Sequence, residues 1–405
     1  MTDAFFVLFG DVLKIFVFLG ENSVFWMPVV LGIVLWKIWR AYLLRRYLSQ
    51  IEWVLLEIKL PKEIKKTPLA MEIVLAGLYQ SSTGEWYEQL TQGRVMIWFS
   101  LELVSIEGAI HFFIRTPKIF QTIVETHIYS QYPGVEIYEV PDYAKYVNYQ
   151  KENTEWEMWG QEYKLNKEDA YPIKTYIDFN IDKEGVKDEE KVDPMTPTLE
   201  WFGSLGKDEQ LWLQILIQPA KSRANTPGKW FKKRDWCDEG KSLINKIIEK
   251  SKLSTPEDFK LTPSDEELVK ALQRNISKLG FDCGIRTIYW VKTTRKFDGA
   301  RVKGLLKLFN QYRSPILNSF APAFTIGFDF PWQDFRGIRA KRGKSRLFNA
   351  YKYRSYFYPP RECKPFVLSM EELATIYHFP GQVAEIPTFG RIESRKGEPP
   401  SNLPI

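Results

Sequence analysis

The stretch WFSLELVSIEGAIHFFIR, residues 98–115, decides the fold prediction. Runs of β-branched and aromatic residues on both sides of the tight turn at 106–108 predict two strands of an antiparallel hairpin, residues 95–105 and 109–115. Pro117 then opens a helix at the first position, which proline favours, and the helix is expected to run to about Tyr132. Residues 135–140 follow as a third strand. This order of elements is typical of an α+β fold with a helix on one face of a largely antiparallel sheet.

A second unit with a similar order of elements follows later in the chain. It contains an apolar strand at 210–218, helices at 230–250 and 264–279, a strand at 281–292 and a helix at 298–312. Ser264 with Glu267 predicts a capping box at the second of these helices. The sequence therefore predicts an α+β protein: an N-terminal transmembrane helix followed by two related α/β-sandwich-like lobes with mainly antiparallel sheets.

Composition sets the domain boundaries. The stretch from Asp182 to Asp193 holds six acids, three lysines and one glycine, which predicts a solvated linker. A strand pair at 156–163 and 171–179 is expected in the first lobe, and residues 314–365 are expected to be irregular. Ser369 with Glu372 predicts a capped helix over 370–379. The resulting division is a membrane anchor at 1–48, a first lobe at 49–181, an acidic linker at 182–197, a second lobe at 198–330, and a basic aromatic segment, short helix and Pro-rich tail at 331–405.

Residues 23–44 are long and apolar enough to cross a membrane if the charged ends of Lys37 and Arg40 extend to the aqueous boundary. Trp26, Trp36 and Trp39 suit the membrane interface. Basic residues gather on the C-terminal side, so the positive-inside rule places residues 45–405 in the cytoplasm. A buried core helix is the main alternative. Residues 4–19 are also apolar but carry two charges, so whether they span stays open.

The overall composition is that of a globular protein rather than a disordered chain. Of 405 residues, 44% are hydrophobic and 26% are charged, and the net charge of +6 is too small to indicate nucleic-acid binding by itself. Three distant cysteines exclude a disulfide framework, and the three histidines occur in no metal-binding spacing. We therefore expect no cofactor, no metal site and no enzyme activity.

One basic cluster stands out near the C-terminus. The segment Gly337–Ser345 ends like a phosphate-binding loop, but the glycine that such a loop needs at position 338 is Ile338. Tyrosine and phenylalanine residues interleave with the basic ones, a combination that suits single-stranded nucleic acid. Anionic lipid, an acidic protein surface and a solvated loop without a specific role are the alternatives. The basic candidates are Arg336, Arg339, Lys341, Arg342, Lys344, Arg346, Lys352 and Arg354.

Several long stretches go beyond generic patterns, namely residues 98–115, 124–143, 192–219, FVLSMEELATIYHFPG at 366–381 and KGEPPSNLPI at 396–405. Together they resemble the membrane-anchored N-terminal region of the conjugation-type, type IV secretion ATPases of candidate-phyla-radiation bacteria, over most of residues 37–405. In that family a segment like the last one leads into a hexameric motor domain, and this chain stops there. The resemblance transfers no catalytic residues.

The resemblance implies a role in a larger machine. We expect a membrane-tethered scaffold subunit of a type IV secretion or conjugation-like apparatus for DNA or protein translocation, anchored in a bacterial cytoplasmic membrane. Its expected partner is a separately encoded, hexameric ATPase motor. The oligomeric state stays open. A membrane-associated nucleic-acid-binding module that uses residues 336–354 is the alternative. The motor-docking candidates lie near the point where the motor would begin: Glu371, Glu372, Tyr377, His378, Phe379 and Pro380.

Overall fold

The structure is a computed structural model of the chain. It describes residues 20–61, 66–147, 149, 155–182, 192–222, 224–225, 233–254, 261–294, 298–326, 332, 334 and 337–381. The chain divides into two compact units, one formed by residues 1–52 and 82–96, the other by residues 53–81 and 97–405. The apolar stretch at 4–19, most of the acidic linker, Arg336 and the Pro-rich tail lie outside the described residues.

The first unit contains the long helix α2 (Ser23–Gln50) and the short helix α4 (Trp86–Thr91). A helix of 28 residues is about 42 Å long, and α2 is long and apolar enough to cross a membrane. Its apolar side chains are exposed, with Phe25 at 78% and Leu35 at 68% of their full accessible surface. Gly93, at φ +70°, lies against the backbone of Leu43, the buried residue of α2.

The second unit is built on a sheet in which every described strand pair is antiparallel. Within the described residues the strand order is β10-β5-β9-β6-β2-β3-β1-β4, and β11 pairs with β9 beside β5. The strands are β1 (Trp53–Lys59), β2 (Phe99–Ile106), β3 (Ala109–Pro117), β4 (Glu136–Val140), β5 (Trp156–Leu165), β6 (Glu209–Pro219), β9 (Gly280–Lys292), β10 (Phe320–Thr325) and β11 (Phe366–Ser369).

The sheet consists of two halves with the same topology. The first half runs β1, α3, β2, β3, α5, β4 and the second runs β5, α6, β6, β9, α9, β10, and each places its strands in the order fourth, first, third, second. This is the ferredoxin-like βαββαβ arrangement, used twice and joined at β2 and β6. The prediction of an α+β protein with mainly antiparallel strands is confirmed, and its two related parts share one continuous sheet instead of forming separate sheets. The four helices are α3 (Leu69–Gly77), α5 (Gln121–Gln131), α6 (Thr196–Gly203) and α9 (Gly299–Leu305).

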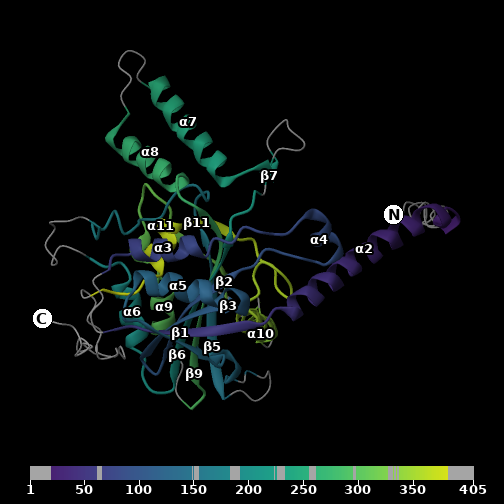
Figure 1. Cartoon of the computed structure of the whole chain (residues 1–405), viewed down its shortest axis with the longest axis horizontal. Coiled ribbons are helices and arrows are strands. Elements are labelled where there is room, and N and C mark those ends of the chain that lie inside the picture. The colour runs from purple at the N-terminus through teal and green to yellow at the C-terminus, as the bar shows by residue number, and fades with distance from the viewer. Residues whose placement is uncertain are drawn as a thin grey trace, which may run out of the picture. The chain divides into compact units, whose positions relative to one another are not determined.

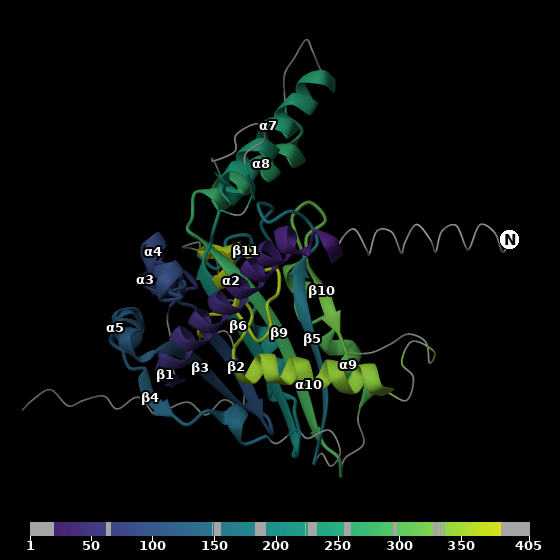
Figure 2. The same ribbon diagram turned by 90° about the vertical axis from the view of Figure 1, so that its right-hand side faces the viewer.

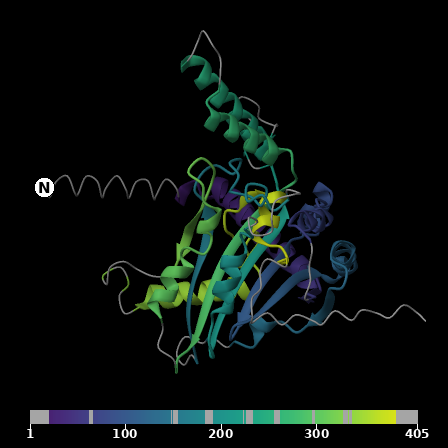
Figure 3. The ribbon, with the colours of Figure 1, turned by 90° about the vertical axis from the view of Figure 1, so that its left-hand side faces the viewer.

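The halves differ at the turn between their second and third strands. In the first half Glu107 and Gly108, with φ values of +55° and +91°, make the tight turn between β2 and β3. The second half has a long insertion there, with the short strands β7 (Ala224–Asn225) and β8 (Lys233–Arg234) and the helices α7 (Trp236–Ser254) and α8 (Pro263–Ile276). These two helices pack on each other and extend away from the sheet (Figures 1 and 3).

Helices cover both faces of the sheet. Because side chains alternate along a strand, Leu211 and Leu213 of β6 belong to the apolar cluster that includes α3, α5, α6 and α9, whereas Trp212 between them belongs to another. That second cluster contains α10 (Ile338–Lys352), which crosses the opposite face of the sheet (Figure 2). The helix α11 (Met370–Ile376) packs against α3 in the first cluster.

Three local predictions were wrong. Residues 171–179 form turns rather than a strand, because some of their backbone N–H groups donate to side chains instead of to a neighbouring strand. The N–H of Ile173 donates to Glu372, and that of Tyr176 donates to Thr375. The stretch 314–365 is not irregular throughout, since it holds β10 and α10. The cap of α8 is Thr262 and not Ser264.

Strand β5 lies in a different half from the one expected. The predicted first lobe included residues 156–163, but β5 pairs with β9 on one side and β10 on the other. The chain therefore passes from the first half to the second between β4 and β5, ahead of the acidic stretch. The partners of β5 are more than 100 residues away, so the sequence around β5 does not show which half it joins. Composition alone therefore places the boundary later, at the acidic stretch.

Candidate functional site

The predicted basic segment folds as the helix α10. Its last two turns bury Leu347, Phe348 and Tyr351 against the sheet. Close approach is possible because β5 has a glycine at position 160, where an added Cβ would lie only 2.6 Å from Leu347 Cδ2. Gly343 packs in the same way against the ring of Phe324. The Gly-Lys-Ser triplet therefore lies inside a helix and serves its packing.

The predicted basic residues fall into three groups. Four are exposed on α10, Arg339, Lys341, Arg342 and Arg346. Lys344 and Lys352 are half-buried, and burial lowers the pKa of Lys344. Arg354 is fully buried just after the helix and Arg336 lies outside the described residues. The aromatic partners separate likewise: Tyr353 is exposed, whereas the rings of Tyr351 and Tyr356 are buried.

Arg354 belongs to a buried ion cluster and not to a binding surface. Its Nε and Nη2 donate to the two carboxylate oxygens of Glu102 at 2.9 and 3.0 Å, and its Nη1 donates to Asp142 at 2.6 Å. Tyr143 also donates to Glu102, at 2.6 Å. Burial alone would raise the pKa of Glu102, but the charge and hydrogen bonds of Arg354 lower it to about 2. Arg354 is thus corrected from an anion-binding candidate to a structural residue that ties the end of α10 to β2.

A cavity of about 550 Å³ lies between α10 and the strand β10. Its lining includes the guanidinium-bearing residues Arg339, Arg342 and Arg346 of α10, together with Arg361 and the backbone segment 323–326. Two contacts hold Arg361 in place: it donates a hydrogen bond to Glu162, and its guanidinium lies 5.2 Å from the centre of the Phe324 ring. The geometry therefore brings four arginines together around one space.

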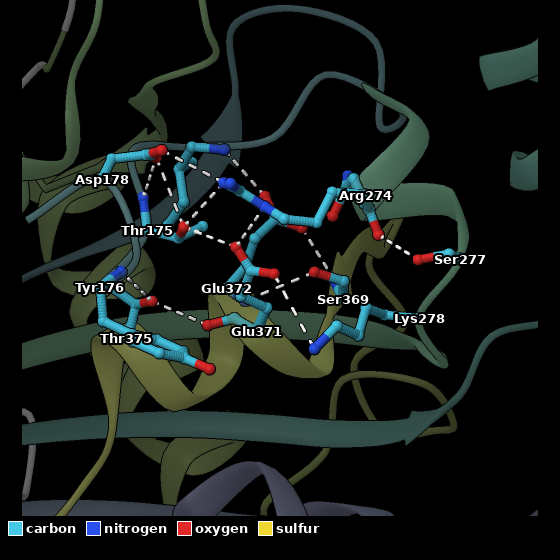
Figure 4. A network of polar contacts seen from close by, with 12 residues as sticks. Thr175, Tyr176, Asp178, Arg274, Ser277, Lys278, Ser369, Glu371, Glu372 and Thr375 are labelled. Carbon is cyan, nitrogen blue, oxygen red and sulfur yellow. Dashed lines mark hydrogen bonds and ion pairs between the residues drawn. The ribbon is translucent and has the colours of Figure 1, made fainter. Parts of the chain in front are cut away.

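The docking candidates on α11 lie in a network of polar contacts (Figure 4). Glu371 is only 2% exposed; it accepts a hydrogen bond from Thr175 Oγ1 at 2.6 Å and pairs with Arg274 Nε at 3.0 Å. Lys278 Nζ lies 4.0 Å from the same carboxylate and donates to Glu72 at 2.8 Å. Burial raises the pKa of Glu371. This network fastens α8 to α11 and α3.

Glu372 completes the predicted capping box with Ser369, which the structure confirms. Its other oxygen accepts the backbone N–H of Ile173 at 2.9 Å. Burial raises the pKa of Glu372 to about 8. The residue thus holds the segment around Ile173 in place instead of facing a partner.

His378 and its neighbours are also internal. His378 Nδ1 donates to the carbonyl oxygen of Ala374 at 2.8 Å, and Nε2 lies 3.1 Å from Asp193. Burial lowers the pKa of His378, but the charge and hydrogen bond of Asp193 outweigh it and raise the pKa above its usual value. The hydroxyl of Tyr377 donates to the Phe113 carbonyl at 3.2 Å. Together with the buried residues Phe379 and Pro380, the whole set lies inside the body, which corrects the expectation that these side chains form a docking surface.

The predicted interfacial residues of α2 are exposed. Trp26, Trp36 and Trp39 show between 41% and 50% of their surface, and Lys37 and Arg40 are also exposed. This placement is the one that a membrane-facing helix requires.

The residues that could not be predicted from the sequence are the ionic partners of buried charged side chains. Glu102, Asp142, Glu162, Asp193 and Arg274 each hold a buried or half-buried ionic contact. An acid in the middle of the apolar stretch 99–106 was the one available signal, since an unpaired charge there would be costly. In the part of the chain that the structure describes, no group of three His, Cys, Asp or Glu side chains is placed to hold a metal ion.

A family model described as a domain of unknown function, DUF8128, matches residues 47–388, which cover most of the chain. A search of the curated proteins finds no match.

Proposed function

Since the chain belongs to the DUF8128 family, whose description assigns no activity, we propose from its structure that it is a membrane-tethered scaffold. The observation that carries the proposal is α2, a 28-residue helix whose apolar side chains are almost all exposed. Exposed apolar surface of this extent is unfavourable in water and is matched by the hydrocarbon core of a bilayer.

The membrane is proposed to be a bacterial cytoplasmic membrane, with the second unit on the cytoplasmic side. Lys37, Arg40, Arg45 and Arg46 support this orientation, because basic residues next to a span favour the cytoplasm. The anchor then consists of α2 alone among the described helices.

A scaffold role fits the way in which the second unit uses its ionisable groups. Glu102, Glu371 and His378 are buried and hold together segments that are far apart in the chain. Such contacts stabilise one arrangement of elements and rigidify the body. The resemblance to the N-terminal region of type IV secretion ATPases supports the machine we propose, in which the body positions an ATPase motor for conjugation-like translocation.

Motor docking is proposed for the Pro-rich tail, residues 382–405, because the α11 candidates are buried. We would purify the full chain from its native membrane in mild detergent and identify co-purifying proteins by mass spectrometry. Deleting residues 382–405 keeps every described element and is expected to abolish recovery of an ATPase. A tail of scrambled sequence and equal composition is the matched control for charge and proline content. Recovery of the motor without the tail would contradict the docking proposal.

A second function, nucleic-acid binding, is favoured by the exposed basic residues on α10. Arg339, Lys341 and Arg342 lie in its first two turns on a helix without acidic residues. Binding of an oligothymidylate to the full chain should then weaken steeply with salt. Changing these three residues to Gln should reduce the salt dependence, whereas changing the exposed Lys303 and Lys307 of the α9 region should not. If neither set of changes alters the affinity for the oligonucleotide, this function is excluded.

A further inference from the structure

A row of arginines lines the cavity between α10 and β10, and it includes two residues of the proposed nucleic-acid surface, Arg339 and Arg342. Arg339, Arg342 and Arg346 follow one another at spacings of three and four residues, so they lie on one face of α10. With a rise of 1.5 Å per residue, their Cα atoms extend over about 10 Å along the helix axis. That face borders the cavity, and Arg361 joins it from the segment after the helix.

We propose that this cavity binds a compact phosphate-bearing anion. Guanidinium groups form paired hydrogen bonds with phosphate oxygens, and a row of them is matched to a ligand that carries more than one such oxygen. The cavity volume of about 550 Å³ is in the range of small-molecule sites.

The charges around the cavity are unbalanced. None of the described residues that line it is acidic. Glu162 approaches Arg361, but Glu162 also lies 4.0 Å from the buried Arg286 and therefore serves two cations. Asp334 accepts the backbone N–H groups of Arg339 and Ala340 at the start of α10. Four arginines thus face two carboxylates, each of which has another partner.

Two of the arginines are available to a ligand. Within the described residues, Arg342 and Arg346 make no hydrogen bond or ion pair through their side chains. Like charges at helix positions three and four apart repel each other, so the row weakens α10 unless an anion lies between the guanidinium groups. Arg361, held by Glu162 and the Phe324 ring, is already in position and loses little freedom on binding.

The strand that forms the other wall indicates a compact ligand rather than an extended peptide. β10 is the last strand of the described sheet, which would make it a place for an added strand. However, Pro322 has no backbone N–H, and the pairing register with β5 shifts between Pro322 and Phe324. These features disrupt the edge, so the arginines and not the strand backbone are expected to hold the ligand.

The test measures thermal stability of the full chain in zwitterionic detergent with pyrophosphate, at an ionic strength held constant with sodium chloride. A bound anion raises the unfolding temperature by mass action. The double variant R342Q/R346Q should lower the pyrophosphate affinity at least roughly tenfold, because it removes two charge-assisted contacts. The matched control is K341Q/K352Q, which removes two positive charges from the same helix at positions that do not line the cavity. Each variant is compared with its own unfolding temperature without ligand, so a change in basal stability does not obscure the result.

A second arm distinguishes a free phosphate from a lipid headgroup. The chain is placed in nanodiscs of phosphatidylcholine with and without phosphatidic acid. If phosphatidic acid raises the unfolding temperature of the wild type but not of R342Q/R346Q, the anion is a headgroup; if only pyrophosphate does so, it is a free phosphate.

Three results would overturn the proposal. They are no response to either anion, equal weakening in R342Q/R346Q and K341Q/K352Q, and binding of an oligothymidylate without binding of pyrophosphate. The last result would assign the arginines to nucleic acid. Because none of these readouts involves a motor protein, failure here leaves the scaffold proposal untouched.

Discussion

Replacing Arg354 by methionine should destabilise the second unit more than any surface change. Arg354 and Glu102 are both fully buried and share two hydrogen bonds. Removing one member of such a pair leaves the other as an uncompensated charge, at a cost of about 3–5 kcal/mol. The pKa of Glu102 leads to a similar magnitude. Its lowering from 4.5 to about 2 corresponds to about 3 kcal/mol in favour of the ionised form in the folded protein.

The assay is urea unfolding of the full chain in detergent, followed by tryptophan fluorescence. Trp212 and Trp290 are fully buried and belong to the cluster that holds Tyr351, so their emission reports on this region. Three variants complete the experiment: R354M, E102Q and the double variant. Because E102Q removes the orphaned charge, the double variant should be less destabilised than the sum of the single changes, by at least about 1 kcal/mol.

The same pair predicts a pH dependence. Since the pKa of Glu102 is lower in the folded state, its contribution is complete above pH 4.5 and is lost as the pH falls toward 2. R354M should flatten the stability profile in that window. The control is R346M, which changes an exposed arginine and should alter stability by less than about 0.5 kcal/mol. If R354M costs no more than R346M, or if the two changes at 354 and 102 are additive, the reasoning about the buried pair is refuted.

Three further predictions concern the rest of the chain. Gly160→Val should destabilise the contact between β5 and α10 by about 1–3 kcal/mol, because the valine side chain would clash with Leu347 and the Thr287 carbonyl. Limited proteolysis should then cut α10 sooner, and an unchanged rate of cleavage would contradict the packing described above. The raised pKa of His378 makes its protonated form stabilising, so the stability of the wild type should decline as the pH rises above 6.5, and His378→Gln should remove this decline. Thermal unfolding across that pH range measures it, and an identical decline in both proteins would exclude His378 as the cause. Deleting residues 23–44 should move the protein from the carbonate-resistant membrane fraction to the supernatant, and its continued presence in the membrane would count against α2 as the anchor.

The sequence predicted elements whose signals are local. The hairpin at 98–115 combines two runs of β-branched and aromatic residues with a tight turn, and the capping box of Ser369 and Glu372 lies within four residues. Both were confirmed. The helix α10 was missed because its apolar contacts are confined to the last two turns, while glycine and basic residues fill the first half.

The candidate site could be predicted only in part. The positive charge of α10 can be read from the sequence. The cavity, however, is also lined by Arg361 and the strand β10, which lie in other segments of the chain. Glu371 and Glu372 seemed available because their partners, Arg274 and Ile173, are about 100 to 200 residues away. Burial of a charge depends on such distant partners, and a single sequence does not reveal them.

The packing of α11 on α3 has a consequence for how the protein is made. Met370 follows Gly77 by 293 residues, and β11 pairs with β9 near the middle of the sheet. At about 5–20 residues per second, a ribosome needs about 15–60 s to synthesise the part between them. During that time α3 lacks its neighbour α11, while α2 has already left the ribosome. Membrane insertion would therefore precede completion of the core, so that each chain finishes folding at the bilayer where it is proposed to work.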